Sequence, residues 1–164
     1  MLHEKIAQSA MRHLAEGCNR IEKCLELTND KTLWEHPNES LVSIGNLIQH
    51  VCGNVSQHIL RGIGGEGFVR DRDSEFEKKE MLSRAQLVAN VRDVVERACS
   101  VIGRMTSDDF ERTFTIQGFT TDGVAVVAHV VEHFSYHVGQ ITYAVKLREN
   151  VSTGYYEGKD LNIP

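Results

Sequence analysis

The feature that most constrains the fold of this chain is the length of the stretches that no helix breaker interrupts. Only two of its 164 residues are prolines, Pro37 and Pro164, and a group of its thirteen glycines stands at 62–65. Because proline breaks a helix interior and glycine weakens one, the remaining stretches are free to form long helices. A chain of this length can bury one continuous core. We therefore expect a single domain over residues 1–164, with 151–164 as an irregular C-terminal tail.

Four segments repeat apolar residues in steps of three and four, the period of an amphipathic helix. They run over residues 2–25, 41–60, 83–105 and 123 to about 150. Asn38 or Ser40 is expected to cap the second segment, and Thr121 or Asp122 the last. The third opens at Ser83 on a capping-box pattern. Four long helices in one domain predict an all-α four-helix bundle.

Two connecting segments have their own patterns. Residues 110–121 (FERTFTIQGFTT) alternate apolar and polar types and are rich in β-branched residues, which predicts a small irregular or hairpin insertion before the last helix. Residues 70–79 (RDRDSEFEKK) are dense in charge, and we expect them to form a solvated loop. An alternative for Arg70, Arg72 and Asp73 is that they line the open end of the bundle and bind an anionic substrate group.

Charge and composition argue against several classes of partner and location. The net charge is −5, the pI is about 5.9 and the basic residues are scattered, so neither a nucleic-acid nor a membrane partner is expected. No apolar run is long enough to span a bilayer, and the charged N-terminal segment does not have the pattern of a secretory signal. We expect a cytoplasmic protein. The four cysteines form no CxxC pair and are expected to be reduced core thiols: Cys18, Cys24, Cys52 and Cys99.

Histidine is the residue type in clear excess, with eight copies. His129, His133 and His137 stand at steps of four in the last expected helix, so adjacent members share one face. The outer two are roughly 12 Å apart along a helix axis. They cannot easily hold the same ion, because a metal–nitrogen bond is only about 2 Å long. At most one adjacent pair can therefore bind a metal, and a third ligand has to come from another helix.

A second polar stripe, His50, Asn54 and His58, follows the same spacing in the second expected helix. One of its histidines and an adjacent pair from the last helix would form a three-imidazole site in the bundle core. Such a site leaves coordination positions open for water or substrate, as catalytic sites do. Imidazole ligands suit zinc, nickel, copper or iron. The glutamates of a di-metal carboxylate bundle are missing, since no Glu-x-x-His motif occurs.

The competing interpretation is that these histidines are ordinary core or rim residues, hydrogen-bonded to a neighbour. A single His-x-x-x-His pair arises often enough by chance to be weak evidence of a metal site. Spacing alone leaves both interpretations open. We expect the core or rim role for four of the eight histidines: His3, His13, His36 and His58.

Three motifs resemble the DinB/YfiT-like superfamily. Residues 129–141 (HVVEHFSYHVGQI) resemble its final-helix signature, in which H-x-x-x-H-x-G-Q recurs. Residues 48–54 (IQHVCGN) are similar to its second-helix motif, and residues 70–76 (RDRDSEF) look like a branch of uncharacterised members. The resemblance covers nearly the whole chain in helix order and implies the superfamily's four-helix bundle.

The resemblance implies that His50, His133 and His137 bind one divalent transition metal, zinc or nickel, and that His129 lies one turn before the site. It implies a metal-dependent enzyme acting on a small molecule. The reaction would be either thiol S-transfer, with a low-molecular-weight thiol activated at the metal, or hydrolysis. Superfamily members are often homodimers, so the resemblance also implies a homodimer.

Asn54 and Gln140 are the candidate catalytic residues. Asn54 could orient substrate or bound water, and Gln140 could hydrogen-bond a ligand histidine and fix its tautomer. A hydrogen bond between helices is the alternative for both amides. The alternative function, from another class, is a non-catalytic metal- or ligand-binding stress-response protein in which the metal is structural.

Overall fold

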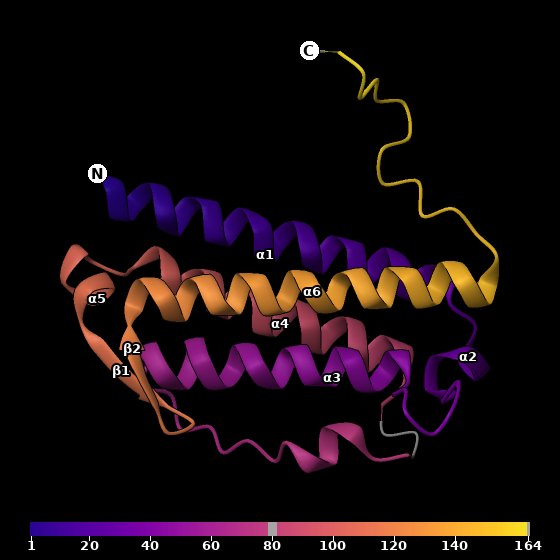
Figure 1. Cartoon of the computed structure of the whole chain (residues 1–164), viewed down its shortest axis with the longest axis horizontal. Coiled ribbons are helices and arrows are strands. Elements are labelled where there is room, and N and C mark those ends of the chain that lie inside the picture. The colour runs from indigo at the N-terminus through magenta and orange to yellow at the C-terminus, as the bar shows by residue number, and fades with distance from the viewer. Residues whose placement is uncertain (79–81, 164) are drawn as a thin grey trace.

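The computed structural model describes residues 1–78 and 82–163 of the chain. Four long helical segments lie side by side in it as a bundle (Figure 1). They are α1 (Leu2–Leu27), α3 (Ile44–Val55), α4 (Arg84–Gly103) and α6 (Gly123–Glu149), and α3 continues directly into the π-helical η1 (Ser56–Ile63). The predicted all-α four-helix bundle is confirmed.

The core of the bundle lies between these helices, because α1 and α3 each pack against both α4 and α6. Gly17 of α1 shows how closely they approach, since a Cβ atom there would lie 2.7 Å from the Phe134 ring of α6. The many valines of α6 lower its intrinsic helix propensity, and burial of its apolar face compensates for this. The largest fully buried side chains include Leu14, Ile21, Leu25, Ile48, Ile102, Phe134 and Ile141.

The second long helix begins later than the sequence predicts. Its N-cap is Ser43, whose hydroxyl accepts a hydrogen bond from the Asn46 backbone N–H at 3.1 Å. The prediction of Asn38 or Ser40 is wrong because Asn38 Oδ1 instead accepts a hydrogen bond from the Ser40 N–H, which closes a local turn. The amide of Asn46 also donates to the backbone carbonyl oxygens of Glu75 and Glu77, so the start of α3 is joined to a distant loop.

A short helix that the sequence does not predict, α2 (Asp30–Trp34), follows α1. The turn-forming residues that end α1 also start this helix, because Asn29 Oδ1 accepts a hydrogen bond from the Thr32 N–H at 2.9 Å. Asn29 therefore follows directly after the C-cap of α1, Thr28, and is itself the N-cap of α2.

The insertion before α6 is a hairpin that follows the short helix α5 (Ser107–Glu111). Its strands, β1 (Thr113–Ile116) and β2 (Phe119–Asp122), are antiparallel and pair Thr113 with Asp122. Gln117 and Gly118 form the two-residue turn with positive φ angles of 53° and 81°, as the hairpin twist requires. Asp122 then caps α6, since its side chain accepts a hydrogen bond from the Ala125 N–H at 2.8 Å.

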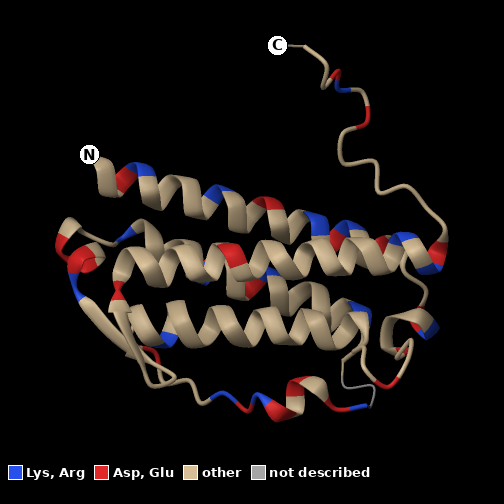
Figure 2. Cartoon of the chain, viewed as in Figure 1, with Lys and Arg blue, Asp and Glu red and all other residues tan. Residues whose placement is uncertain are grey.

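The connection from η1 to α4 follows α3 and packs against it through one 3-10 turn, η2 (Asp73–Phe76) (Figure 1). Figure 2 shows that this connection carries charges of both signs. The predicted solvated loop over 70–79 is right for the exposed Arg72 and Asp73, and residue 79 lies outside the described residues. The prediction is wrong for Glu75, which is only 6% exposed, because the buried Arg70 guanidinium compensates the charge of its carboxylate.

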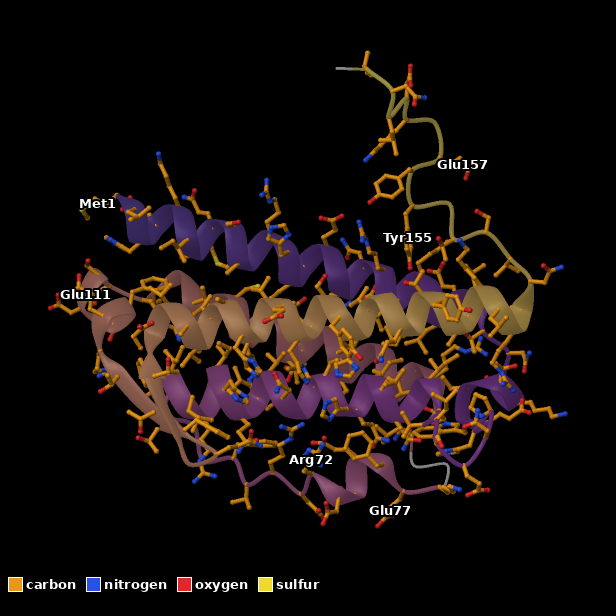
Figure 3. All side chains as sticks on the ribbon, in the orientation of Figure 1. Met1, Arg72, Glu77, Glu111, Tyr155 and Glu157 are labelled. Atoms are coloured by element: carbon orange, nitrogen blue, oxygen red, sulfur yellow. The ribbon has the colours of Figure 1, made fainter. Side chains whose placement is uncertain are left out.

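The tail after α6 has neither helix nor strand over residues 150–163. Tyr155 fastens it to the bundle, since its hydroxyl lies 2.9 Å from Thr142 Oγ1 and 3.1 Å from Cys24 Sγ. Figure 3 shows this side chain directed back toward the helices. Within residues 1–78 and 82–163, none of the helices is both long enough and apolar enough to cross a membrane.

The four cysteines are free thiols, and three of them are buried while Cys99 is half-buried. Burial raises the pKa of Cys18 to about 12 and also raises that of Cys52. Cys18 and Cys52 are therefore protonated at neutral pH and behave as small core residues, as the sequence predicts.

Candidate metal centre

Three histidines converge where α3 and α6 pack together. His50 comes from α3, and His133 and His137 come from successive turns of α6. One nitrogen of each imidazole lies within 4.8 Å of the others. The closest pair is His50 Nε2 and His133 Nε2, which are 3.2 Å apart. The structure thus brings together the three residues that the resemblance singles out.

The convergence follows from the helical spacing of the sequence. His133 and His137 lie on one face of α6, with their ring centroids 4.5 Å apart, beside the buried Phe134 and Val138. His50 is itself buried in α3, whereas the two α6 histidines are half-buried. The cluster is therefore closed on the side of α3 and partly open to solvent on the side of α6.

His50 is held by a buried carboxylate. Its Nδ1 lies 2.9 Å from Glu75 Oε2, and 3.2 Å from an Arg70 guanidinium nitrogen. The carboxylate of Glu75 can only accept a hydrogen bond from Nδ1, whereas the guanidinium of Arg70 can only donate one to it. Arg70 already donates to both oxygens of Glu75, at 2.6 and 2.8 Å, which satisfies it without His50. We therefore assign Nδ1–H as the donor to Glu75, which leaves the Nε2 lone pair facing His133.

Arg70 and Glu75 form a buried ion pair. The side chains are 4% and 8% exposed. Burial raises the pKa of the Glu75 carboxyl, but hydrogen bonds from His50 and Arg70 outweigh burial and lower it overall. Gly53 makes room for the pair, since a Cβ atom there would lie 2.0 Å from Glu75 Oε1. Glu75 is thus an ionised carboxylate in a fixed position.

The candidate catalytic residue Gln140 contacts a cluster histidine within its own helix. Its Oε1 lies 2.7 Å from His137 Nδ1, so this nitrogen donates and the Nε2 lone pair is free. Both residues belong to α6, so Gln140 does not make the hydrogen bond between helices that is the alternative for it. Asn54 Oδ1 is buried and has no hydrogen-bond partner within residues 1–78 and 82–163. It lies one turn after His50 on the same helix.

Burial and the neighbouring imidazoles favour the neutral forms of His133 and His137. Burial, followed by the neighbouring imidazoles of His137 and His50, lowers the pKa of His133 to about 3. Burial and His50 also lower the pKa of His137, against the opposing effect of its bond to Gln140. Neutral imidazole is the form that binds metal ions, so His133 and His137 are in the metal-binding form at neutral pH.

The other histidine pair lies one turn away. The rings of His58 and His129 are 4.9 Å apart, and His129 is 5.6 Å from the ring of His133. His58 is buried and its Nδ1 lies 3.0 Å from the Asn54 carbonyl oxygen, in agreement with the predicted core role. His129 is exposed and is not part of the three-histidine cluster.

The charged loop supplies one residue that the sequence analysis missed. Arg70 is expected either in solvent or against an anionic substrate. Its guanidinium instead donates to both carboxylate oxygens of Glu75. Arg72 instead covers the Phe76 ring, with its guanidinium carbon 4.9 Å from the ring centroid. Nothing in the charged stretch marks Glu75 as buried, and the space that Gly53 leaves for it is seen only in the fold.

The donor set fits a divalent transition metal ion. Without an ion, the facing Nε2 atoms of His50 and His133 require one ring to carry its proton there and donate to the other. The bonds of His50 to Glu75 and of His137 to Gln140 place their protons on Nδ1, so His133 is the ring that would donate from Nε2 to His50. His133 Nδ1 is buried without a partner among the described residues. An ion bound by the Nε2 lone pairs of His50 and His137 and by one nitrogen of His133 fits this donor set.

Comparison with known proteins agrees with this fold. The family model described as "Protein of unknown function (DUF1572)" matches residues 3–154, and no curated protein matches the chain. A DinB-like protein from Bacillus cereus is 15% identical, with a TM-score of 0.69 over 89% of this chain and 94% of its own. The DinB-like protein YjoA from Bacillus subtilis is 16% identical, with a TM-score of 0.67 over 88% and 94% of the two chains.

A third similar structure is YfiT from Bacillus subtilis, described as a probable metal-dependent hydrolase with an unusual four-helix bundle topology. It is 14% identical, with a TM-score of 0.72 over 89% of each chain. At these identities the likeness shows the fold. The chain has the DinB/YfiT-like fold and belongs to the DUF1572 family.

Proposed function

We propose that this protein is a metal-dependent hydrolase in which His50, His133 and His137 hold one divalent ion. The observation that carries the proposal is the convergence of three imidazole nitrogens from two helices within 4.8 Å. Ligand nitrogens about 2 Å from a tetrahedral ion are roughly 3.3 Å from one another. The 3.2 Å between His50 Nε2 and His133 Nε2 already matches that spacing.

The ligand count favours a catalytic over a structural ion. Among the described residues, no cysteine or carboxylate joins the three histidines as a fourth ligand. Structural zinc sites are usually closed by four protein ligands, whereas catalytic sites keep a position open. The half-buried His133 and His137 leave the cluster accessible from the side of α6. Zinc and nickel are the ions that we expect, because both suit imidazole ligands.

The ion would supply a nucleophile at neutral pH by lowering the pKa of bound water. The protein's own residues prepare the site. Glu75 holds Nδ1–H of His50 and Gln140 holds Nδ1–H of His137, so both rings present Nε2 to the same point. The buried carbonyl oxygen of the Asn54 side chain, one turn after His50, has no partner among the described residues, and a buried water would satisfy it.

The description of YfiT as a probable metal-dependent hydrolase supports the same class of reaction. A low-molecular-weight thiol in place of water is the second candidate nucleophile. Such a thiol would have to come from outside the protein, because no cysteine of the described chain belongs to the three-histidine cluster. Burial also raises the pKa values of Cys18, Cys52 and Cys99.

The proposal is tested by assaying metal-free, zinc-loaded and nickel-loaded protein on small esters and amides, and on an alkyl halide with a small thiol. Hydrolysis should appear only in a loaded form and vanish in His133→Ala. The matched control is His13→Ala, which removes an exposed histidine on α1 and should keep full activity. Thiol transfer without hydrolysis would favour the second nucleophile. Equal rates with and without metal would contradict both.

A further inference from the structure

A cavity of about 200 Å³ lies beside the three-histidine cluster, between the β-hairpin and the first turns of α6. Figure 1 shows the hairpin at this end of α6. None of the three cluster histidines lines this cavity or the larger hollows along α1 and beside the tail. This cavity is distinguished by His129, which lines it and whose ring is 5.6 Å from that of His133. The apolar walls of the cavity come from both elements: Ile116, Phe119, Ala125 and Val126.

The wall nearest the candidate metal centre consists of two histidines. His58 and His129 line the cavity, and the ring of His129 is 5.6 Å from that of His133. His58 Nδ1 donates to the Asn54 carbonyl oxygen, which can only accept. The neutral ring therefore keeps Nε2 as an acceptor. A molecule in the cavity would meet a hydrogen-bond acceptor at the end that adjoins the cluster.

The remaining polar lining is neutral. Gln117 and Thr121 contribute to it, and no aspartate, glutamate, lysine or arginine of the described chain does. The hairpin is also fixed in place, because Gln117 Nε2 donates to Gln57 Oε1 at 2.9 Å. Gln57 Oε1 accepts a second bond from Arg70, the same residue that holds Glu75. The cavity wall and the support of His50 thus form one hydrogen-bonded unit.

We propose that this cavity is the substrate pocket and that it takes an uncharged molecule with one compact apolar arm and an N–H donor, such as an aromatic amide. The size fits, since an apolar cavity of about 150 Å³ is enough to bind benzene. The apolar arm occupies the hairpin side, and the N–H faces His58 Nε2. As a substrate pocket this site rests on the proposed hydrolase. As a binding site it stands on the cavity alone.

The test uses benzamide as the probe and benzoate as its anionic counterpart of similar shape. Binding to the purified protein is followed by backbone amide NMR shifts, with and without added zinc. Benzamide should shift the signals of Gln117, Ala125 and His58. Benzoate should bind at least about tenfold more weakly than benzamide, because its charge finds no partner in the cavity and it has no N–H to donate.

A pair of alanine variants locates the site. Ala125→Leu fills the cavity and should weaken benzamide binding roughly tenfold or more. Ala128→Leu is the matched control, because Ala128 is exposed on the same helix and does not line the cavity, and it should change binding less than twofold. Thermal unfolding and metal content are measured on the same samples, and Ala125→Leu should keep the wild-type metal content.

Absence of benzamide binding to the wild-type protein, equal losses in the two variants, or benzoate binding as tight as benzamide would each overturn the proposal. The benzoate comparison needs only the wild-type protein, so it decides even where Ala125→Leu does not fold. If the wild-type protein binds benzamide with the predicted pattern but binds no metal, the binding pocket stands and the proposed hydrolase fails.

Discussion

Glu75 Oε2 accepts a hydrogen bond from Nδ1 of His50 over 2.9 Å, and both side chains are buried. A loop residue twenty-five positions further along the chain thereby sets the tautomer of a histidine on α3. The arrangement matches the carboxylate–histidine pairs that orient metal ligands in other proteins. It makes Glu75 a positioning residue of the proposed centre, although it does not reach the cluster itself.

Glu75→Gln should therefore weaken metal affinity by about 10–100-fold, the usual effect of losing such a partner. The amide keeps the shape of the side chain but not the charge that fixes Nδ1–H. Competition with a chromophoric chelator measures the affinity. Asp73→Asn, an exposed acid-to-amide change two residues earlier, serves as the control and should bind metal as the wild type does. Equal affinities in all three proteins would remove Glu75 from the centre.

Arg70→Met should destabilise the protein by about 3–5 kcal/mol, because it leaves a buried carboxylate without its cation. Adding Glu75→Leu should recover much of that loss, since an apolar pair of similar size has no charge to desolvate. Urea unfolding measures both effects. Arg72→Met removes an exposed arginine that covers the Phe76 ring, and should cost no more than about 1 kcal/mol. A double variant as unstable as Arg70→Met would contradict this account.

Gly53→Ala should cost about 1–3 kcal/mol of folding free energy, because its Cβ would lie 2.0 Å from Glu75 Oε1 and 3.0 Å from Arg70 Nε. The ion pair is hydrogen-bonded in place and has little freedom to move aside. Gly139→Ala on α6 is the matched control, since nothing lies within 4 Å of the added methyl group. That variant should gain up to about 1 kcal/mol from helix propensity. Chemical denaturation of both variants gives the comparison, and a stabilised Gly53→Ala would be the contrary result.

The metal-free protein should lose stability as the pH falls from about 6.5 toward 3. The pKa of His133 is lowered from 6.5 to about 3 in the folded chain, chiefly by burial. Over that interval the unfolded chain binds a proton that the folded chain does not, so the free energy of unfolding decreases as the pH decreases. The lowered pKa of Glu75 acts in the same direction at the acidic end.

Urea unfolding at several pH values between about 7 and 4 gives this slope. His133→Gln should flatten it, because a neutral amide has no proton to bind, whereas the exposed His13→Gln should leave it unchanged. A wild-type stability that is constant over this range would show that His133 titrates normally in the folded protein.

The sequence predicts the four long helices well because their apolar periods are long and only Pro37 interrupts the chain before its last residue. It also places the hairpin, where β-branched residues alternate with polar ones around Gln117-Gly118. The start of α3 and the helix α2 were missed, because Asn29, Asn38 and Ser43 are all good caps. The choice among such caps depends on tertiary contacts, such as the bond from Asn46 to the loop around Glu75.

The candidate site, like the fold, is predicted from the sequence only in part. Steps of four place His133 and His137 on one face, so their proximity is a local property of a helix. The pairing with His50 needs the packing of α3 on α6, and spacing left His58 as an equal choice. Glu75 could not be found from composition, since an acid in a charged stretch is usually solvated. Only the fold shows that Arg70 and Gly53 create a buried place for it.

The central claim is tested most directly by metal analysis of the purified, untagged protein beside the triple variant His50→Ala, His133→Ala and His137→Ala. The account predicts about one zinc- or nickel-class ion per chain in the wild type, and none in the variant, after equal exposure to metal. Absence of metal from the wild type even after reconstitution, or equal metal in both proteins, would contradict it.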